Sequence, residues 1–247
     1  MPGQAMTDHQ PPLTPAPSPC RAWMALGVQH AILARAMPVL RHDLAGLLTI
    51  MRMGAVVLRR RAGDAAQAAG SDTLAQQLEQ QEEHLASLAD NARLLRHWDL
   101  QGPHTPEPLA ETAALARRLS RPLLAMRGLA LELPAEGTPA LPAARTPQQP
   151  VLCLLLGAIH LLAENPAGAP AAIHLQPLPG RAAGLRVQAS GTCPDAPPAA
   201  ATPGMPPLDG AALALLAEHV GAQLRCGPDW VEIEAPAAAP DARPAAA

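Results

Sequence analysis

A histidine beside an acid stands within residues 39–53, VLRHDLAGLLTIMRM, near the start of a long apolar pattern. An imidazole acts as a nucleophile at one ring nitrogen when a carboxylate accepts the proton of the other, and His42 and Asp43 offer such a pair. The seam of the pattern begins with Leu40 and Leu44. At about 100° per residue, His42 lies roughly 160–200° from that seam. The spacing therefore predicts an imidazole that points to solvent.

Small residues follow this histidine one helical turn later. Ala45 and Gly46 have almost no side chain, and a glycine inside a helix costs about 1 kcal/mol relative to alanine. We interpret them as open space over the imidazole that another protein can approach. Thr49 and Met53 continue the same face, so these four residues form the predicted docking surface. The alternative is an exposed histidine without a chemical role.

Two long helices must position this surface. We predict a helix over residues 21–61, with Pro38 as a kink or a boundary, then a polar loop over 62–73 and a second helix to about residue 100. Apolar residues repeat in 4-3-4 steps in both. The seam positions are Leu40, Leu44, Leu47, Met51, Gly54 and Leu58 in the first helix, and Leu74, Leu78, Gln81, Leu85, Leu88, Ala92 and Leu95 in the second. Matched seams predict an antiparallel hairpin, residues 21–100, that forms a four-helix bundle as a homodimer.

The remaining chain alternates helical and strand-like segments. Residues 1–20 and 236–247 are expected to be disordered, and 101–108 to be a linker. Over 109–235 we expect an α+β sandwich with helices on one face of a sheet. Its predicted helices are 109–127, 151–164 and 208–224, its strands are 129–133, 171–178, 184–190 and 230–235, and 134–150 is a proline-rich loop.

Composition excludes several classes of protein. The chain has 247 residues and a net charge of −3, so we expect no nucleic-acid partner. The four cysteines lack metal-ligand spacing, which is typical of a reducing compartment. No secretory signal is visible and no apolar run approaches the ~20 residues that span a membrane. These features predict a cytoplasmic protein without a membrane segment or metal site.

The segment RHDLAGLLTIMRM resembles the phosphoacceptor box of two-component histidine kinases. The matching residues are His42, Asp43, Leu44, Leu48 and Thr49. Leu47 stands where proline is common, and Gly46 replaces the Asn or Thr that many members use in dephosphorylation, which argues against phosphatase activity. The hairpin and the following α+β layout also fit, so the resemblance covers roughly residues 25–235.

This resemblance implies a chemistry for the pair. His42 would carry a phosphoryl group on Nε2, and Asp43 would orient the ring and act as general base. The phosphoryl group would pass to an aspartate of a response regulator receiver domain, whose own site supplies Mg²⁺. The chain would need no cofactor of its own for this transfer.

The segments that should bind ATP depart from the family pattern. In CLLLGAIH (153–160), Cys153 and Gly157 stand where the two asparagines would be, and His160 replaces a basic residue. Asn165 is a nearby amide, but it would match an asparagine of this box only in a shifted alignment.

The second segment, VQASGTC (187–193), has lost its acid. Ala189 replaces the aspartate that holds adenine, Gly191 is kept, and Cys193 replaces a glycine. Gly210 is the only glycine of the third box before its helix. Together these losses argue against ATP binding.

Three functions remain open. The first is a histidine phosphotransferase of a phosphorelay, which moves phosphoryl groups between receiver aspartates through His42 without ATP. The second is a cytoplasmic histidine kinase that lacks a sensor and has a divergent ATP site. The third is a non-catalytic pseudokinase scaffold that binds response regulators.

Overall fold

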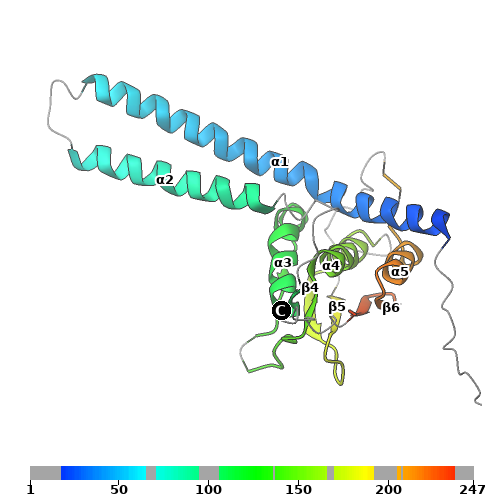
Figure 1. The fold of residues 1–247 in the computed structure, drawn as a ribbon. Coiled ribbons are helices and arrows are strands. Elements are labelled where there is room, and N and C mark those ends of the chain that lie inside the picture. Colours follow the sequence, from blue (N-terminus) through cyan, green and yellow to red (C-terminus); the bar gives the residue numbers. More distant parts are fainter. Residues whose placement is uncertain are drawn as a thin grey trace, which may run out of the picture.

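A helical hairpin and a layered region of helices and strands make up the fold (Figure 1). The computed structural model describes residues 18–64, 71–94, 106–135, 137–165, 170–191, 205–206 and 208–236. The helices are α1 (Pro19–Asp64), α2 (Ser71–Leu94), α3 (Leu109–Ala125), α4 (Gln148–Ala163) and α5 (Gly210–His219). The strands are β1 (Pro106–Pro108), β2 (Leu131–Glu132), β3 (Arg145–Pro147), β4 (Ala172–Pro177), β5 (Gly184–Ser190), β6 (Gln223–Cys226) and β7 (Trp230–Glu234). Across these ranges, none of the helices combines the length and the hydropathy that crossing a membrane requires.

Helices α1 and α2 lie side by side as the predicted hairpin (Figure 1). The α1 residues that turn toward α2 follow the predicted spacing. Half-buried positions in this part of α1 include Leu44, Leu47, Met51, Gly54 and Leu58. The seam predicted on α1 is therefore confirmed, because apolar residues spaced by three and four share one face of a helix.

The seam of α2 differs in part from the prediction. Its half-buried residues are Gln81, His84 and Leu88, whereas Leu78 and Leu85 are 50% and 51% exposed. A Cβ at Gly54 would collide with the side-chain amide of Gln81, so that amide occupies the space beside the glycine. The predicted seam positions Gln81 and Leu88 are therefore half-buried as expected, whereas the predicted positions Leu78 and Leu85 are exposed.

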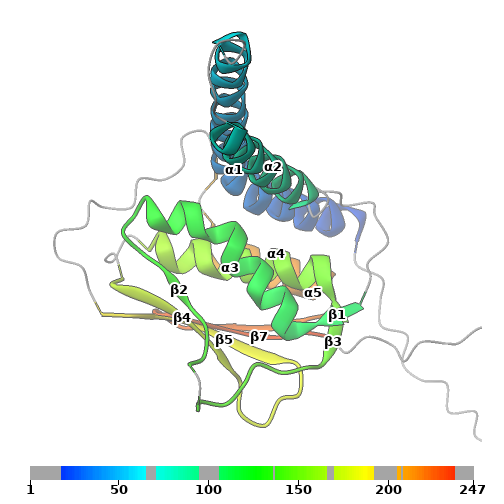
Figure 2. The same ribbon diagram turned by 90° about the vertical axis from the view of Figure 1, so that its left-hand side faces the viewer.

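A five-stranded sheet in the order β2-β4-β5-β7-β6 supports the second part of the fold. Strands β2 and β4 are parallel and the other neighbours are antiparallel. Helices α3, α4 and α5 cover one face of this sheet (Figure 2). The expected α+β arrangement with helices on one face is therefore observed, and strands β1 and β3 form an additional antiparallel pair.

The core lies between these helices and the sheet. Alternate residues of the central strands face it, including Ile173 and Leu175 of β4, Leu185 and Val187 of β5, and Val231 and Ile233 of β7. Helix α4 is buried along almost its whole length, because it lies between the sheet and other helices. A helix that is apolar on all sides is stable only in such surroundings.

Three short elements escaped the sequence patterns. Helix α5 ends at His219 rather than 224, since Gly221 takes a φ of 72° and the chain reverses into β6. Strand β1 lies in the predicted linker, and β3 in the predicted proline-rich loop. Both strands contain proline, which lacks the N–H of a regular strand and hides such segments from pattern analysis.

The first part of α1 does not belong to the hairpin alone, because it lies over α4 and α5 (Figures 1 and 2). Helix α1 continues through Pro38, so of the two predicted alternatives a kink is observed and a boundary is not. Figure 2 shows that the dark-blue start of α1 runs in a different direction from the rest, as expected where proline removes a helical hydrogen bond. The predicted disordered ends lie outside the described residues apart from 18–20 and 236.

Candidate functional site

His42 lies on α1 with an exposed side chain, while its neighbours Leu40 and Leu44 are buried and half-buried. The prediction that the imidazole points away from the seam is therefore confirmed. Asp43 also lies in α1, but its side chain is outside the described part of the structure. Its expected role in orienting the imidazole stays a prediction.

The four predicted docking residues share a surface with His42. Ala45 and Thr49 are exposed, and Met53 is 66% exposed. A Cβ at Gly46 would meet nothing within 4 Å, so open space adjoins the backbone there. The Thr49 hydroxyl donates to the Ala45 carbonyl at 2.8 Å, which uses its proton within the helix. This surface offers one imidazole among small and apolar groups.

The first predicted nucleotide segment lies inside α4, where its side chains are buried. Cys153 is fully buried, and burial raises the pKa of its thiol to about 12 although a hydrogen bond from Gln29 opposes that rise. Gly157 is enclosed by Ile32 of α1 and Leu213 of α5. Both positions are therefore occupied by contacts with other parts of the chain.

His160 follows on the same helix and is buried. Burial, then Arg35 and then Arg127, lowers the pKa of His160 from 6.5 to about 3, so the imidazole is neutral. Both arginines pair with Glu164, at 3.4 and 3.5 Å. Neither ring nitrogen of His160 has a hydrogen-bond partner. A neutral, enclosed imidazole cannot supply the positive charge that the family's basic residue offers a phosphate.

The second predicted segment provides no acid either. The Ala189 N–H donates to the Asp229 carbonyl at 2.8 Å within the sheet. Gly191 has a φ of 65°, and a Cβ there would lie 2.9 Å from the Cβ of Ala171. The positive φ and the close approach of Ala171 thus explain why residue 191 is glycine. Cys193 lies outside the described residues.

Within the described residues, these positions of α4 offer no side-chain amide to a nucleotide. The positions expected to offer amide groups carry a thiol and a hydrogen atom, and both face packed side chains. Asn165, the amide of the shifted alignment, donates to the Pro228 carbonyl at 3.1 Å. Within the described residues, no group of three or more His, Cys, Asp or Glu side chains is arranged to hold a metal ion.

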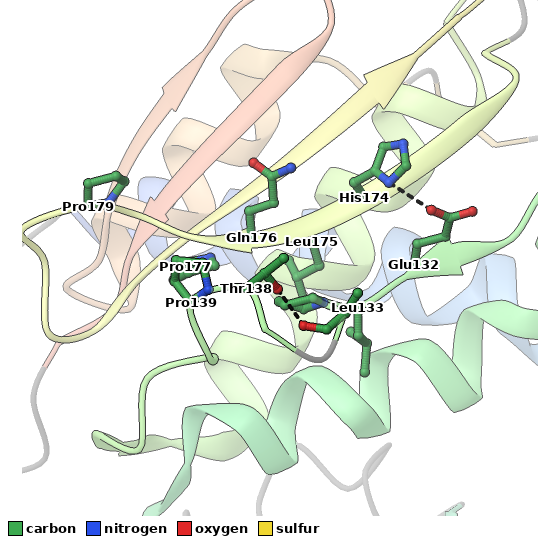
Figure 3. A pocket seen from close by; sticks show the side chains of 11 residues that line it. Glu132, Leu133, Thr138, Pro139, His174, Leu175, Gln176, Pro177 and Pro179 are labelled. Carbon is green, nitrogen blue, oxygen red and sulfur yellow. Dashed lines mark hydrogen bonds and ion pairs between the residues drawn. The ribbon is translucent and has the colours of Figure 1, made fainter.

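A cavity of about 470 Å³ opens at the edge of the sheet (Figure 3). Its lining is rich in proline, and Glu132 and His174 lie at one end. Nδ1 of His174 lies 3.0 Å from the Glu132 carboxylate, and Nε2 lies 2.7 Å from the Ser190 hydroxyl. In the pairing of β4 with β5, Ser190 lies opposite Ala172, two residues before His174 on β4. Ser190 does not line the cavity. Glu132 and His174 therefore line one end of the cavity, whereas their partner Ser190 lies outside it.

Sequence reasoning missed the contacts that α1 makes with α4. Gln29, Ile32 and Arg35 are buried there. A signal was present, because the buried residues Ala25, Gln29, Ile32, Ala36 and Leu40 stand four, three, four and four residues apart and extend one helical face back through the start of α1. That spacing predicts a buried face but not which element covers it.

Comparison with known proteins gives structural matches only. No protein-family profile matches the chain, and no curated protein matches it. The Acinetobacter baumannii histidine kinase AdeS is 15% identical, over 78% of this chain and 96% of that one, with a TM-score of 0.34. A histidine kinase from Burkholderia phymatum is 19% identical, over 78% and 94%, with a TM-score of 0.30.

A third similar structure is full-length ShkA in complex with AMPPNP. It is 12% identical over 83% of this chain, with a TM-score of 0.31, and the match spans 47% of ShkA. Overlaps at this level carry no functional inference. Any function must therefore be argued from the residues of this chain.

Proposed function

We propose that the protein is a histidine phosphotransferase of a two-component phosphorelay, in which His42 carries phosphoryl groups between receiver aspartates without using ATP. The observation that carries this proposal is the position of His42. Its imidazole is exposed on α1, outside the seam, and small residues adjoin it. The resemblance of this segment to a phosphoacceptor box supplies the chemistry.

The proposed transfer needs one nucleophile and a partner. Nε2 of His42 attacks the phosphorus of a receiver acyl phosphate. The P–N bond forms as the P–O bond to the receiver aspartate breaks, and that aspartate leaves as a carboxylate. Asp43 is expected to hold the Nδ1 proton and stabilise the charged ring. The Mg²⁺ of the receiver neutralises charge on the phosphoryl oxygens, so this chain needs no metal of its own.

The surroundings of α4 favour a phosphotransferase over a kinase. A kinase must bind ATP beside its α/β region, yet Gly157 is enclosed by Ile32 and Leu213. The imidazole of His160 is buried and neutral. An exposed histidine together with a filled α4 surface fits a protein that receives phosphoryl groups from another protein.

Exposed apolar residues on the hairpin support the proposed homodimer. They include Ile50, Val57 and Leu85, each at least 41% exposed. Two helices alone bury little apolar area, and a second copy would cover these side chains in a four-helix bundle. The face with His42 would remain open to receivers.

A label-transfer assay tests the function. Purified protein is offered either radiolabelled ATP with Mg²⁺ or receiver domains from the same genome that carry a radiolabelled phosphoryl group. The His42→Ala variant removes the proposed nucleophile. His30→Ala is the matched control, since His30 is also an exposed histidine of α1. Acid-labile, alkali-stable label on the protein reports phosphohistidine.

We expect label from a receiver but not from ATP, lost in His42→Ala and kept in His30→Ala. Label from ATP would instead identify a kinase with a divergent site. Receivers that bind the protein but never transfer label, although they exchange it with a known phosphotransferase, would favour the scaffold function. Either of these outcomes overturns the proposal.

A further inference from the structure

The outer surface of α4 and α5, on the side away from the sheet, is covered by α1 of the same chain (Figure 2). We name residues 25–36 of α1 the α1 arm. Its buried apolar side chains are Ala25, Ile32, Leu33 and Ala36. Because burial of apolar area stabilises a contact, the arm belongs to the core of the α/β region as much as to the hairpin.

Gly157 is the point of closest approach in this contact. A Cβ at this position would lie 2.5 Å from Cδ2 of Leu213 and 2.9 Å from Cδ1 of Ile32. Such distances are shorter than carbon atoms tolerate, so any side chain here must displace one neighbour. Glycine at this position is therefore what lets the arm and α5 meet over α4.

Polar contacts fix the arm on both sides of Ile32. Toward its start, Nε2 of Gln29 donates to Sγ of Cys153 at 3.6 Å. Toward its end, the guanidinium of Arg35 donates to the Pro206 carbonyl at 2.8 Å and pairs with Glu164 at 3.4 Å. The Arg35 side chain is only 2% exposed. A buried charge is tolerated only where its hydrogen bonds are made, so these contacts favour one position of the arm on α4 and α5.

We propose that the α1 arm is an internal ligand of the α4–α5 surface and occupies the place where the histidine kinase resemblance would put a nucleotide. Cys153 and Gly157 are then docking positions for the arm, not remnants of a nucleotide site. Restoring an amide at residue 157 displaces the arm rather than restoring nucleotide binding. Only the reference to a nucleotide rests on the proposed function; the contact between arm and α4 does not.

The arm also fixes the α/β region relative to the candidate phosphoacceptor. Arg35 and His42 lie on one helix, about 10 Å apart along its axis at 1.5 Å per residue. A domain that must deliver ATP to a histidine has to move toward it, whereas this region is anchored through α1 itself. The arm therefore holds the region in one place beside the hairpin.

The test replaces Gly157 by the amide residue of the family pattern. Hydrogen exchange of the full-length protein is followed in the arm, in α4 and in the outer hairpin, and MgATP binding is measured by calorimetry. Gly157→Asn is the perturbing variant. Gly27→Asn is the matched control, because Gly27 lies in the same arm and a Cβ there meets nothing within 4 Å.

We expect exchange in the arm of Gly157→Asn to rise about 100-fold while the outer hairpin is unchanged, with no MgATP binding. Gly27→Asn should exchange like the wild type. Wild-type protection of the arm in Gly157→Asn would overturn the proposal, as would MgATP binding by that variant with the arm still protected. Neither readout involves phosphotransfer, so failure here is distinguishable from failure of the proposed function.

A double-mutant cycle keeps the test decisive if Gly157→Asn folds poorly. Ile32→Ala removes one of the two side chains that face residue 157. We expect Ile32→Ala by itself to raise exchange in the arm. Combined with Gly157→Asn, it should offset part of the effect of that variant, because the effects of substitutions at residues in contact are not additive. Additive effects on exchange would mean that the arm does not meet Gly157, and would overturn the proposal.

Discussion

His160 makes the stability of the fold sensitive to acid. Its imidazole is buried, and burial together with Arg35 and Arg127 lowers its pKa from 6.5 to about 3. The folded protein thus keeps His160 neutral, whereas the unfolded chain binds a proton below pH 6.5. Stability from this group is fully present above pH 6.5 and is lost as pH falls toward about 3, because the unfolded state then binds more protons.

The size of the loss follows from the two pKa values. Each pH unit between them costs about 1.4 kcal/mol, so about 2 kcal/mol is lost at about pH 5. That is a large part of the stability of an ordinary domain, about 5–15 kcal/mol. Glu164 pairs with both arginines at 3.4 and 3.5 Å, so their charges remain partly balanced while His160 is neutral.

Urea unfolding from pH 8 to 5 measures this effect. His160→Leu removes two buried ring nitrogens that lack hydrogen-bond partners, so we expect equal or greater stability at pH 8 and a flatter decline toward pH 5. His219→Leu is the control, since His219 is exposed on α5 and should leave the decline unchanged. If His160→Leu loses stability as steeply as the wild type below pH 6.5, the neutral buried imidazole is refuted.

Three further predictions test the arm, the dimer and the cysteines. Arg35→Leu should cost about 1.5–3 kcal/mol in urea unfolding because it removes the charged hydrogen bonds of Arg35 to Glu164 and to the Pro206 carbonyl, although Arg127 still pairs with Glu164. Arg93→Leu, which removes the exposed ion pair with Asp90, should cost less than about 1 kcal/mol, and equal losses would contradict the contribution of the buried Arg35 contacts. Ile50→Asp should convert the proposed homodimer to monomer in analytical ultracentrifugation, and an unchanged mass would argue against a dimer through this face. Iodoacetamide should modify exposed Cys20 in the folded protein but Cys153 only after unfolding, as mass spectrometry of digests would reveal; rapid native modification of Cys153 would contradict its burial.

Local sequence patterns predicted the helices and strands in which buried residues recur at regular intervals. The alternation in AAIHLQPL and GLRVQAS located β4 and β5, because every second residue of a strand at the sheet interior faces the core. The exposed position of His42 also followed from spacing alone, since the seam fixes the opposite face of a helix. What His42 does with a phosphoryl group stays a prediction, because position does not determine reactivity.

Contacts between distant segments could not be predicted in the same way. The buried face of the α1 arm was visible as spacing, but the same spacing fits α2, a second copy or α4. The choice depends on Gly157, where a missing side chain admits Ile32. In the hairpin, Gln81 fills the space beside Gly54, as the predicted seams placed them, but exposed Leu78 and Leu85 depart from the predicted seam. Glycines in helices are ambiguous from sequence, because the residue that approaches them lies elsewhere in the chain.

The residues of α4 that depart from the histidine kinase pattern all interact with the α1 arm. Residues 153, 157 and 160 are three and four apart and so share a face of the helix. In the same order along the arm, Gln29 bonds Cys153, Ile32 meets Gly157, and Arg35 lowers the pKa of His160. Replacing any one of residues 153, 157 and 160 by the residue of the family pattern should therefore disturb the arm, since each contact is supported by its neighbours. All three residues of α4 that depart from the histidine kinase pattern therefore interact with the α1 arm.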